Sequence, residues 1–272
     1  MRVFAGGLII LLLLIGNTGC REGAPNLLTA KTAPGVTIEG VNVGDLRQDQ
    51  LEAAVGDLAA KRRIMPRNAF FESATGEIVP EMPGREVELA ATVRAALAAA
   101  PSSSLAALYT KIEPEITRDK LSSAVKLAAY ATDILDRNPD RSENIRLTAA
   151  VINNAVLEPG EEFSFNRRTG EPTAERGFCY AVVFNNGRQE LGLGGGMCQV
   201  SSTLYNAVIQ ARLKVTERHQ HSQPVSYVPA GQDATTYTDK DLRFVNSARH
   251  LVMIKALIKG EAVWVEIWEL PK

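Results

Sequence analysis

The sequence predicts an α+β fold in two domains, a small N-terminal α+β domain followed by a larger mixed α+β domain. The chain has 272 residues, of which 45% are hydrophobic, so it can bury a sizeable core and divide into two modest domains. Runs with the alternation of strands and runs with the spacing of helices occur in both parts. All 3 histidines, and every cysteine except Cys20, follow residue 115, so we expect the second domain to carry the chemistry.

The charge of the chain indicates which classes of molecule it can bind. The 30 Lys and Arg residues are balanced by 31 Asp and Glu residues, which gives a formal net charge of -1. Binding to nucleic acid depends on clustered Lys and Arg side chains that contact phosphates. Because the sequence has no basic excess, we do not expect nucleic acid as a partner.

The first 20 residues have the pattern of a signal peptide. Arg2 precedes the apolar run "VFAGGLIILLLLI", which is shorter than the roughly 20 residues that a membrane-spanning helix needs. The run ends at "GNTGC", where small residues lead to Cys20 as in the lipobox of bacterial lipoproteins, although Asn17 stands where that pattern prefers leucine. We therefore expect an exported bacterial protein that a lipid on Cys20 anchors to the membrane in the cell envelope. Cleavage without lipidation is the alternative.

The first domain, residues 34–115, follows a tether of residues 21–33 that is rich in Gly, Pro, Asn and Thr. The domain opens with "VTIEGVNVGDL", whose alternation around Gly40 predicts a short strand pair. A second strand region is expected at "AFFES" and "EIVPEM".

Two helices are expected in the first domain. Asp49 is predicted to cap a helix that buries Leu51, Val55 and Leu58. The stretch "ELAATVRAALAAA" predicts a second helix by propensity, and Pro101 ends it. The domain contains neither Cys nor His, so we expect it to bind or to act as a spacer rather than to catalyse.

The second domain, residues 116–272, begins with a helix and ends with a hairpin. Ser142 is predicted to cap "ENIRLTAAVINN", in which apolar residues recur at helical spacing. "LEPGEEFSFN" predicts a turn followed by a short strand. The two apolar runs that flank Lys259, Gly260 and Glu261 predict a structural β-hairpin near the C-terminus.

The stretch "LGLGGGMCQVSSTLYNAVIQA" places a cysteine, Cys198, where a helix is about to begin. Backbone N–H groups and the dipole at a helix N-terminus stabilise a thiolate, and such sites lower the pKa of a thiol from ~8.5 into the range of about 3.5 to 7.5. The sequence therefore indicates a nucleophile. Three glycines directly before it would let a substrate backbone approach, and their N–H groups could hold an oxyanion: Gly194, Gly195 and Gly196.

A base for this thiol is expected among the histidines. His219 and His221 lie in "ERHQHSQPVSYVP", which predicts a strand with both rings on one face. One imidazole would meet Cys198, and Asp233 in the turn "AGQDA" would orient it, as in a Cys-His-acid site. Which histidine serves is left open, and His250 is given no role.

Three other interpretations use the same residues. Cys198, His219, His221 and Asp233 have the ligand types of a zinc site, although the tight spacing of zinc motifs is missing. In an exported protein, Cys179 and Cys198 could instead form a disulfide. A domain that only binds a glycopeptide strand is the third alternative. We favour the thiol enzyme and expect neither a metal nor a cofactor.

Four motifs in order resemble the VanW domain: "NIRLTAAVINNAVLEPGEEFSFNRRTGEPTAERGF", "GGGMCQVSSTLYNAVIQA", "ERHQHSQPVSYVPAGQDATT" and "DLRFVN". The resemblance covers residues 121–268 and is specific, because all four motifs are present. The preceding domain resembles, more weakly, the peptidoglycan-binding domain that often precedes VanW domains. Two motifs depart from the usual pattern: "QVSST" stands for "QVSTT", and Arg212 stands where a glycine usually ends the helix.

The resemblance implies a role in the bacterial cell wall, with peptidoglycan as partner. VanW domains are named from glycopeptide-resistance clusters, and some are associated with L,D-transpeptidation by the motif cysteine, which Cys198 matches. His219 and His221 match the histidines of the family's "RHxHS" motif. On this pattern Cys198 would attack the carbonyl after the third stem residue, expel D-Ala and form a thioester that the amine of a second stem resolves. With water as acceptor the enzyme would be a thiol amidase, and a zinc-dependent amidase is a further alternative.

Residues near Cys198 or in the matching motifs are candidates for contacting the substrate or bracing the site. Besides the three glycines, they are Gln199, Ser201, Arg218, Tyr227, Arg146 and Asn166.

Overall fold

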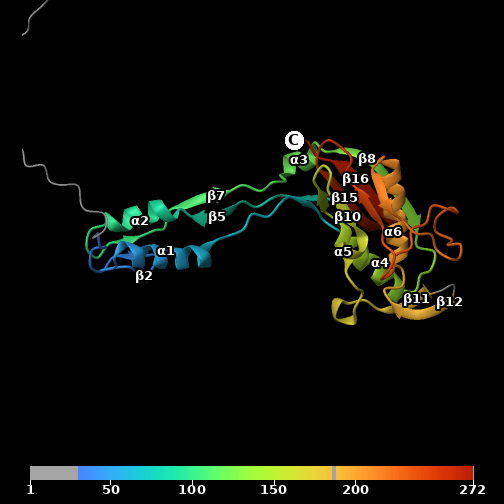
Figure 1. Cartoon of the computed structure of the whole chain (residues 1–272), viewed down its shortest axis with the longest axis horizontal. Helices are drawn as coiled ribbons and strands as arrows, with labels where there is room; N and C mark the ends of the chain where they lie inside the picture. The colour runs from blue at the N-terminus through green and yellow to red at the C-terminus, as the bar shows by residue number, and fades with distance from the viewer. Residues whose placement is uncertain (1–29, 186–187, 272) are drawn as a thin grey trace, which may run out of the picture. The chain divides into compact units, whose positions relative to one another are not determined.

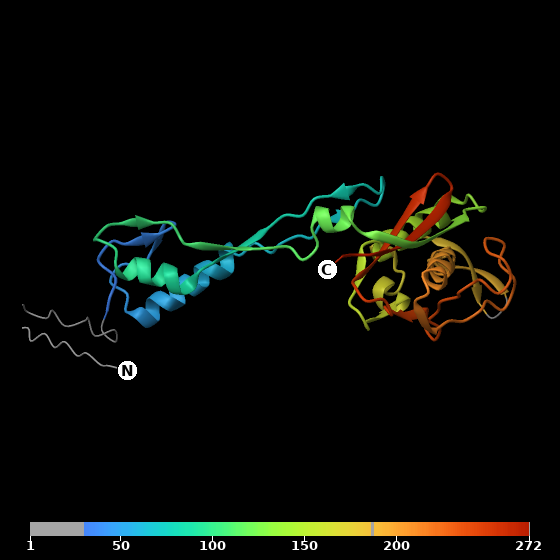
Figure 2. The ribbon, with the colours of Figure 1, turned by 90° about the horizontal axis from the view of Figure 1, so that it is seen from above.

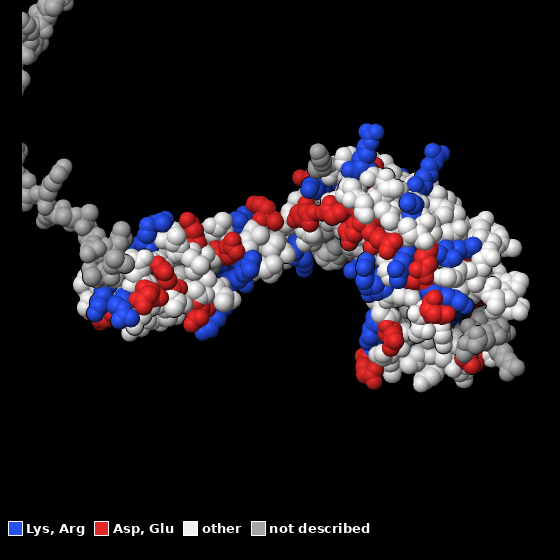
Figure 3. Space-filling view, viewed as in Figure 1, with Lys and Arg blue, Asp and Glu red and all other residues white. Residues whose placement is uncertain are grey.

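The computed structural model of the chain describes residues 30–185 and 188–271. The expected signal peptide, Cys20 and most of the expected tether lie outside the described residues. Within them the chain forms helices and several small sheets, which confirms the predicted α+β class (Figure 1). No helix in the described part is long and apolar enough to cross a membrane. On the face drawn in Figure 3, acidic and basic side chains are intermixed.

Two compact units make up the described chain: residues 30–63 with 86–110, and residues 64–85 with 111–271. The expected boundary lay near residue 116. The observed division differs from it mainly at residues 64–85, which the sequence had placed in the first domain.

The first unit combines a three-stranded sheet with two helices that pack on each other (Figure 2). Strand β1 lies in the middle of the sheet, antiparallel to β2 and parallel to β6. The sheet and helices enclose one apolar cluster. The elements are β1 (Thr37–Ile38), β2 (Val41–Asn42), α1 (Gln48–Arg62), α2 (Leu89–Leu97) and β6 (Ser104–Leu105).

The strand pair around Gly40 and both helices of this unit are confirmed. Glu39 and Gly40 have positive φ values of 48° and 82° and form the tight turn between β1 and β2. The three apolar residues expected on the inner side of α1 are buried. The expected cap is wrong, because α1 begins at Gln48 and Asp49 lies in its first turn, 3.2 Å from the Arg47 guanidinium.

The second unit is built on a four-stranded antiparallel sheet in the order β8, β16, β15, β9. Helices α4 and α6 pack against one face of it (Figure 1). Val263, Val265 and Ile267 alternate along β16 and are fully buried in the core that this face forms with the helices. The bounds are β8 (Val125–Asp133), α4 (Pro139–Ile152), β9 (Ala155–Leu157), α6 (Met197–Gln210), β15 (Val252–Lys259) and β16 (Ala262–Glu269).

Smaller elements complete the chain. Strands β10, β14 and β13 form an antiparallel sheet in that order, while β3 with β4, β5 with β7, and β11 with β12 form two-stranded sheets. Their bounds, with the short helices, are β3 (Phe70–Phe71), β4 (Ile78–Val79), β5 (Gly84–Val87), β7 (Tyr109–Ile112), α3 (Arg118–Ser122), β10 (Glu162–Ser164), α5 (Phe165–Thr169), η1 (Ala174–Arg176), β11 (Tyr180–Asn185), β12 (Arg188–Leu193), β13 (Lys214–Glu217) and β14 (Arg243–Val245).

Residues 69–78 of the segment 64–85 pack against the face of the main sheet away from α4 and α6. The Phe71 ring lies 5.8 Å from the Trp268 ring, and the Lys255 ammonium lies 4.3 Å from the centre of the Phe71 ring. Such a cation over an aromatic face is attracted by the ring quadrupole. Lys255 Nζ also donates to the Gly76 carbonyl at 2.8 Å. These contacts explain why this segment belongs to the second unit.

The start of α4 differs from the prediction by one turn. The helix begins at Pro139, and the side-chain oxygen of Asn138 accepts a hydrogen bond from the Arg141 N–H at 3.0 Å. Ser142, the expected cap, therefore lies inside the helix. A proline at the first position suits this start, because its missing N–H would have no partner there.

Of the two strand regions expected around the histidines and the C-terminus, one is confirmed. The β15–β16 hairpin turns at Gly260 and Glu261 as predicted. The strand expected over "ERHQHSQPVSYVP" is wrong, because β13 ends at Glu217 and His219 makes only an isolated bridge with Thr235. The two prolines in the segment cannot donate to a ladder, which disfavours a strand there.

Candidate active site

Helix α6 fixes the position of Cys198. The helix begins at Met197, so Cys198 is its second residue, as the sequence predicted. Val200, Leu204 and Val208 are fully buried in the main core, which anchors the helix against the sheet. The cysteine itself is partly exposed. A cysteine of intermediate exposure is thus held at a helix N-terminus.

The three glycines before the cysteine are buried against other parts of this chain. A Cβ on Gly195 would lie 2.6 Å from the Val182 carbonyl oxygen, and one on Gly196 would lie 2.8 Å from Ile145 Cγ1. A Cβ on Gly194 would meet Pro172 at 2.8 Å. Because these glycines lack side chains, α4, β11 and the loop that contains Pro172 can pack closely against their backbone. Contact of these glycines with a substrate stays a prediction.

Replacing Gly196 with alanine should destabilise the protein strongly. Gly196 has φ of 113° and its Cβ would clash with Ile145, so we expect a loss of about 2–4 kcal/mol in the free energy of unfolding. Gly260→Ala is the matched control, because Gly260 also has positive φ, 57°, but has nothing within 4 Å of its Cβ. That variant should lose about 1 kcal/mol. Equal losses in urea unfolding would contradict the steric argument.

Backbone donors of the first turn of α6 are partly free. The N–H groups of Met197 and Gln199 donate to the carbonyls of Gly194 and Gly196 at 3.1 and 3.0 Å. Among the described residues no backbone acceptor is placed for the N–H of Cys198, which lies between them. Such a donor at a helix N-terminus is suited to holding negative charge.

His221 connects the thiol to a carboxylate. Its Nδ1 lies 2.7 Å from Asp233 Oδ2, and its backbone N–H donates to the same oxygen at 2.6 Å. The ring also interacts with the Cys198 thiol strongly enough to lower the pKa of that thiol, and because Nδ1 faces the carboxylate, Nε2 is the nitrogen left for the sulfur. Both the histidine and the aspartate side chains are nearly buried, with 7% and 11% of their surface exposed. The three groups form one connected Cys-His-Asp set.

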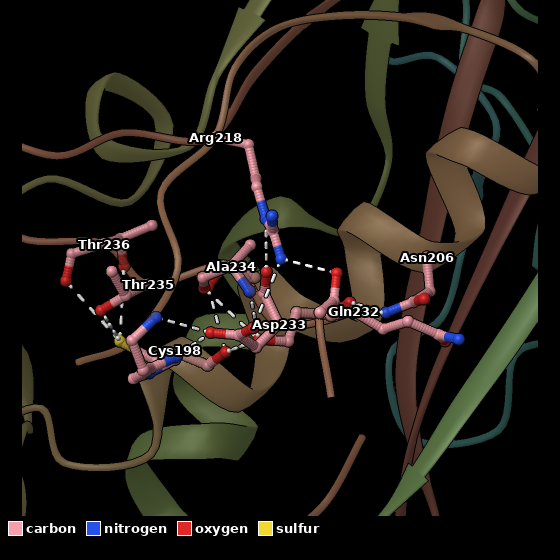
Figure 4. A network of polar contacts seen from close by, with 12 residues as sticks. Cys198, Asn206, Arg218, Gln232, Asp233, Ala234, Thr235 and Thr236 are labelled. Atoms are coloured by element: carbon pink, nitrogen blue, oxygen red, sulfur yellow. Dashed lines mark hydrogen bonds and ion pairs between the residues drawn. The ribbon is translucent and has the colours of Figure 1, made fainter. Parts of the chain in front are cut away.

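Arg218 holds the aspartate from the other side. Its Nε donates to the Asp233 carbonyl at 2.6 Å, and its Nη2 lies 3.3 Å from Asp233 Oδ1 (Figure 4). The guanidinium also stacks 4.9 Å from the Tyr205 ring centre. Arg218, a candidate for contacting the substrate, is therefore used here to brace the acid.

The residues after Asp233 lie against the sulfur. Cys198 Sγ is 3.7 Å from Thr235 Oγ1, 3.8 Å from Thr236 Oγ1 and 3.6 Å from the Thr236 carbonyl oxygen (Figure 4). Neither threonine was singled out from the sequence. They directly follow the predicted acid in "QDATT", so a search for hydroxyl groups next to that acid would have found them.

The electrostatics of the set favour an ion pair. Burial raises the pKa of the Cys198 thiol, but the hydrogen bond and the positive charge of His221 outweigh it. With the Thr236 backbone N–H and the Thr235 hydroxyl also stabilising the thiolate, the pKa falls to about 7. For His221, burial lowers the pKa, but the bonds to Cys198 and Asp233 raise it above its usual range. Both shifts favour a thiolate beside an imidazolium.

Tyr227 and Asp233 complete the local charge balance. Burial and the charge of Cys198 raise the pKa of Tyr227, so its phenol stays neutral. Burial alone would raise the pKa of Asp233, but hydrogen bonds from the backbone and ring of His221 lower it below its usual range. The carboxylate is therefore ionised when it faces the imidazolium.

Other residues singled out from the sequence brace the site. The Gln199 amide accepts from Arg141 Nη2 at 2.9 Å and donates to the Asp133 carbonyl at 2.9 Å, so it ties α6 to α4 and β8. The Asn166 amide donates to the carbonyls of Tyr237 and Lys240 at 2.7 and 2.9 Å and holds the loop after the threonines.

Two of the singled-out residues make other contacts. Arg146 is half-exposed and pairs with Glu143 of the same helix at 2.7 Å. The His219 ring lies 2.9 Å from Glu217. The two histidines therefore do not share one face as expected, and His221 alone reaches the thiol.

Asn144 was missed by the sequence analysis. This fully buried side chain donates to the carbonyls of Cys179 and Gly195, both at 3.0 Å, and accepts from the Cys179 N–H at 2.8 Å. It thereby ties the glycine loop to β11. It could have been found from the sequence as a polar residue next to Ile145 on the buried face of a predicted helix.

The alternatives based on zinc and on a disulfide do not fit this geometry. The ring nitrogens of His221 face Asp233 and Cys198, and His219 turns to Glu217, so the four ligand types do not converge. Within residues 30–185 and 188–271, no group of three or more His, Cys, Asp and Glu side chains could hold a metal ion. Cys179 and Cys198 are both free thiols.

Comparison with known proteins finds a family match in this region. Residues 140–268, which include the whole Cys-His-Asp set, match the family model described as "VanW like protein". Over 162 residues, 59% of this chain, the sequence is 38% identical to "Uncharacterized protein YoaR" of Bacillus subtilis (strain 168). Over 97 residues, 34% of this chain, it is 31% identical to "Vancomycin B-type resistance protein VanW" of Enterococcus faecalis (strain ATCC 700802 / V583).

The matches cover part of each relative: 53% of the Bacillus protein and 35% of the Enterococcus protein. No solved structure matches the chain. The resemblance to VanW domains is thus confirmed, while the peptidoglycan-binding character expected of the first domain stays a prediction.

Proposed function

Because residues 140–268 form a VanW-like domain, we propose that this chain is a cell-envelope enzyme that transfers acyl groups on the stem peptides of peptidoglycan. One relative carries vancomycin resistance in its name, which supports a role at the cell wall. The observation that carries the proposal is the connected set of Cys198, His221 and Asp233 at the N-terminus of α6. This arrangement is that of a nucleophile with its base and an orienting acid.

In the first half-reaction, the Cys198 thiolate attacks the carbonyl carbon of a stem-peptide bond and a C–S bond forms. The carbonyl oxygen becomes an oxyanion, and the N–H of Cys198 is the backbone donor suited to hold it. When the intermediate collapses, the C–N bond breaks and His221 Nε2 gives its proton to the leaving amine, which departs as D-Ala. The product on the enzyme is a thioester, and His221 is then neutral.

The second half-reaction resolves the thioester. A side-chain amine from a second stem attacks the thioester carbonyl, and neutral His221 takes a proton from the amine. An amide bond forms, the C–S bond breaks, and the thiolate and imidazolium are restored. Asp233 keeps the ring oriented through Nδ1 in both steps.

The test is to incubate the purified chain with disaccharide-tetrapeptide and to read the products by mass spectrometry. We expect a cross-linked dimer and free D-Ala in equal amounts. A trimmed stem without dimer would make water the acceptor and would overturn the transpeptidase assignment. Unchanged substrate, in a preparation whose Cys198 still reacts with iodoacetamide, would contradict the enzyme and favour a module that only binds peptidoglycan.

Export and lipid anchoring are part of the proposal. The apolar run and the small residues before Cys20 support them, and both lie outside the described residues. A lipid anchor would keep the enzyme at the membrane surface, next to its substrate.

Changing Cys20→Ser should release the protein from membranes, because the modified thiol would be lost. Detergent phase separation of cell fractions measures this directly. The wild type should enter the detergent phase and the variant the aqueous phase. Equal partitioning of the two proteins would refute lipidation. Cleavage of the signal peptide without lipidation would then be the remaining interpretation.

A further inference from the structure

Two threonines next to the Cys198 sulfur take no part in the bond changes described above. Thr235 Oγ1 and Thr236 Oγ1 lie 3.7 and 3.8 Å from Sγ, within hydrogen-bonding distance for sulfur. The Thr236 carbonyl oxygen lies 3.6 Å from the same atom. The sulfur therefore faces two hydroxyl groups and one carbonyl group from a single short segment (Figure 4).

This segment is fixed to its neighbours by backbone contacts. The Ala234 N–H donates to Ser202 Oγ at 2.9 Å, and the Ala234 carbonyl accepts from Ser201 Oγ at 2.6 Å. The Thr235 N–H donates to the His219 carbonyl at 2.9 Å. Ser201, a candidate for contacting the substrate, and His219 thus help to set where the two hydroxyls lie.

The groups around the sulfur respond differently to its charge. A carbonyl oxygen can only accept, so the Thr236 carbonyl favours the protonated thiol. A hydroxyl can rotate and donate, so both threonine hydroxyls can serve a thiolate. Hydrogen bonds to charged groups are the stronger ones, so the two donors should outweigh the single acceptor once the thiol ionises.

We propose that the hydroxyl groups of Thr235 and Thr236 stabilise the thiolate of Cys198 by donating hydrogen bonds to its sulfur. The segment that carries Asp233 then serves both partners of the ion pair, with a carboxylate for the imidazolium and hydroxyls for the thiolate. This inference deepens the proposed function, but the ionisation of the thiol can be measured without any substrate.

The experiment follows alkylation of the Cys198-containing peptide by iodoacetamide, read by mass spectrometry, between pH 5 and pH 10. Thr235→Val removes the hydroxyl and keeps a branched side chain of similar shape. We expect this variant to react about tenfold more slowly than the wild type at the acid end, with equal rates at the alkaline end. Thr236→Val should slow the reaction in the same direction, and the double variant should slow it further.

Two controls separate this effect from damage to the fold. Thr235→Ser restores a hydroxyl and should recover most of the wild-type rate. Thr238→Val changes an exposed threonine in the same loop and should leave the rate unchanged. Wild-type rates in both Thr235→Val and the double variant would overturn the inference, whatever the enzyme does with stem peptides. A slowed double variant together with no turnover by the wild type would instead refute only the proposed function.

Discussion

Replacing Cys198 with alanine is expected to abolish turnover of stem peptides while the protein stays folded. Every bond change in the proposed mechanism passes through the sulfur, so its removal should lower the rate by about 10⁴-fold or more. The change should cost little stability, because the residue is partly exposed at a helix end and alanine is a good helix former. Mass spectrometry of the products gives the rate, and urea unfolding gives the stability.

Cys179→Ala is the matched control for this variant. Burial and the nearby carboxylates of Asp140 and Glu143 raise the pKa of the Cys179 thiol, so it should remain protonated at neutral pH. This variant should keep its turnover, and in the wild type iodoacetamide at pH 7 should label Cys198 first. Full turnover by Cys198→Ala would show that the cysteine is not the nucleophile, and the glycine loop would then belong to a binding module.

Replacing His221 with alanine should have the second largest effect. The histidine supplies the main forces that lower the thiol pKa, so without it burial should raise that pKa into or above the range of an ordinary thiol. Loss of both the thiolate and the proton donor should lower turnover by about 10³- to 10⁴-fold. Single-turnover kinetics should show that acylation of Cys198 is the slowed step.

The pH dependence of alkylation tests whether His221 lowers the pKa of the Cys198 thiol. Only the thiolate reacts, so the wild-type rate should rise as the pH increases through about 7. In His221→Ala the same rise should occur at a distinctly higher pH. His219→Ala serves as the control, because its ring contacts Glu217, and the profile should not move. A profile that shifts in His219→Ala but not in His221→Ala would reverse the two assignments.

The position of Cys198 could be predicted from the sequence because it depends on local patterns. Apolar residues at helical spacing after the glycines fixed where α6 begins, and the cysteine followed from that start. Asp233 was found as the only acid in the turn after the histidine motif. The sequence could not show which histidine lies next to the thiol. That depends on an irregular backbone conformation in which the His221 N–H donates to the Asp233 carboxylate.

Long-range packing explains what the sequence did not show. The glycines suggested room for a ligand, but the space beside Gly196 is filled by Ile145 from a helix fifty-one residues earlier. Asn144 lies one position before that isoleucine and bonds to two distant carbonyls, which no local pattern could indicate. At Arg212, where a glycine is usual, the arginine itself adopts a positive φ of 58°. It thus takes the left-handed conformation with which a glycine commonly ends a helix.

The packing of residues 69–78 against the main sheet has a consequence for how this protein can be cut or recombined. The family match begins at residue 140, yet strands β15 and β16 within it pack against this segment, which lies far upstream in the chain. A fragment that starts at residue 111 would bare the apolar surface around Trp268 and leave the Lys255 ammonium without its aromatic partner Phe71. We expect such a fragment to self-associate. On this expectation the matched region is not an autonomous module that gene fusion could transplant alone, and it should be inherited together with the upstream segment.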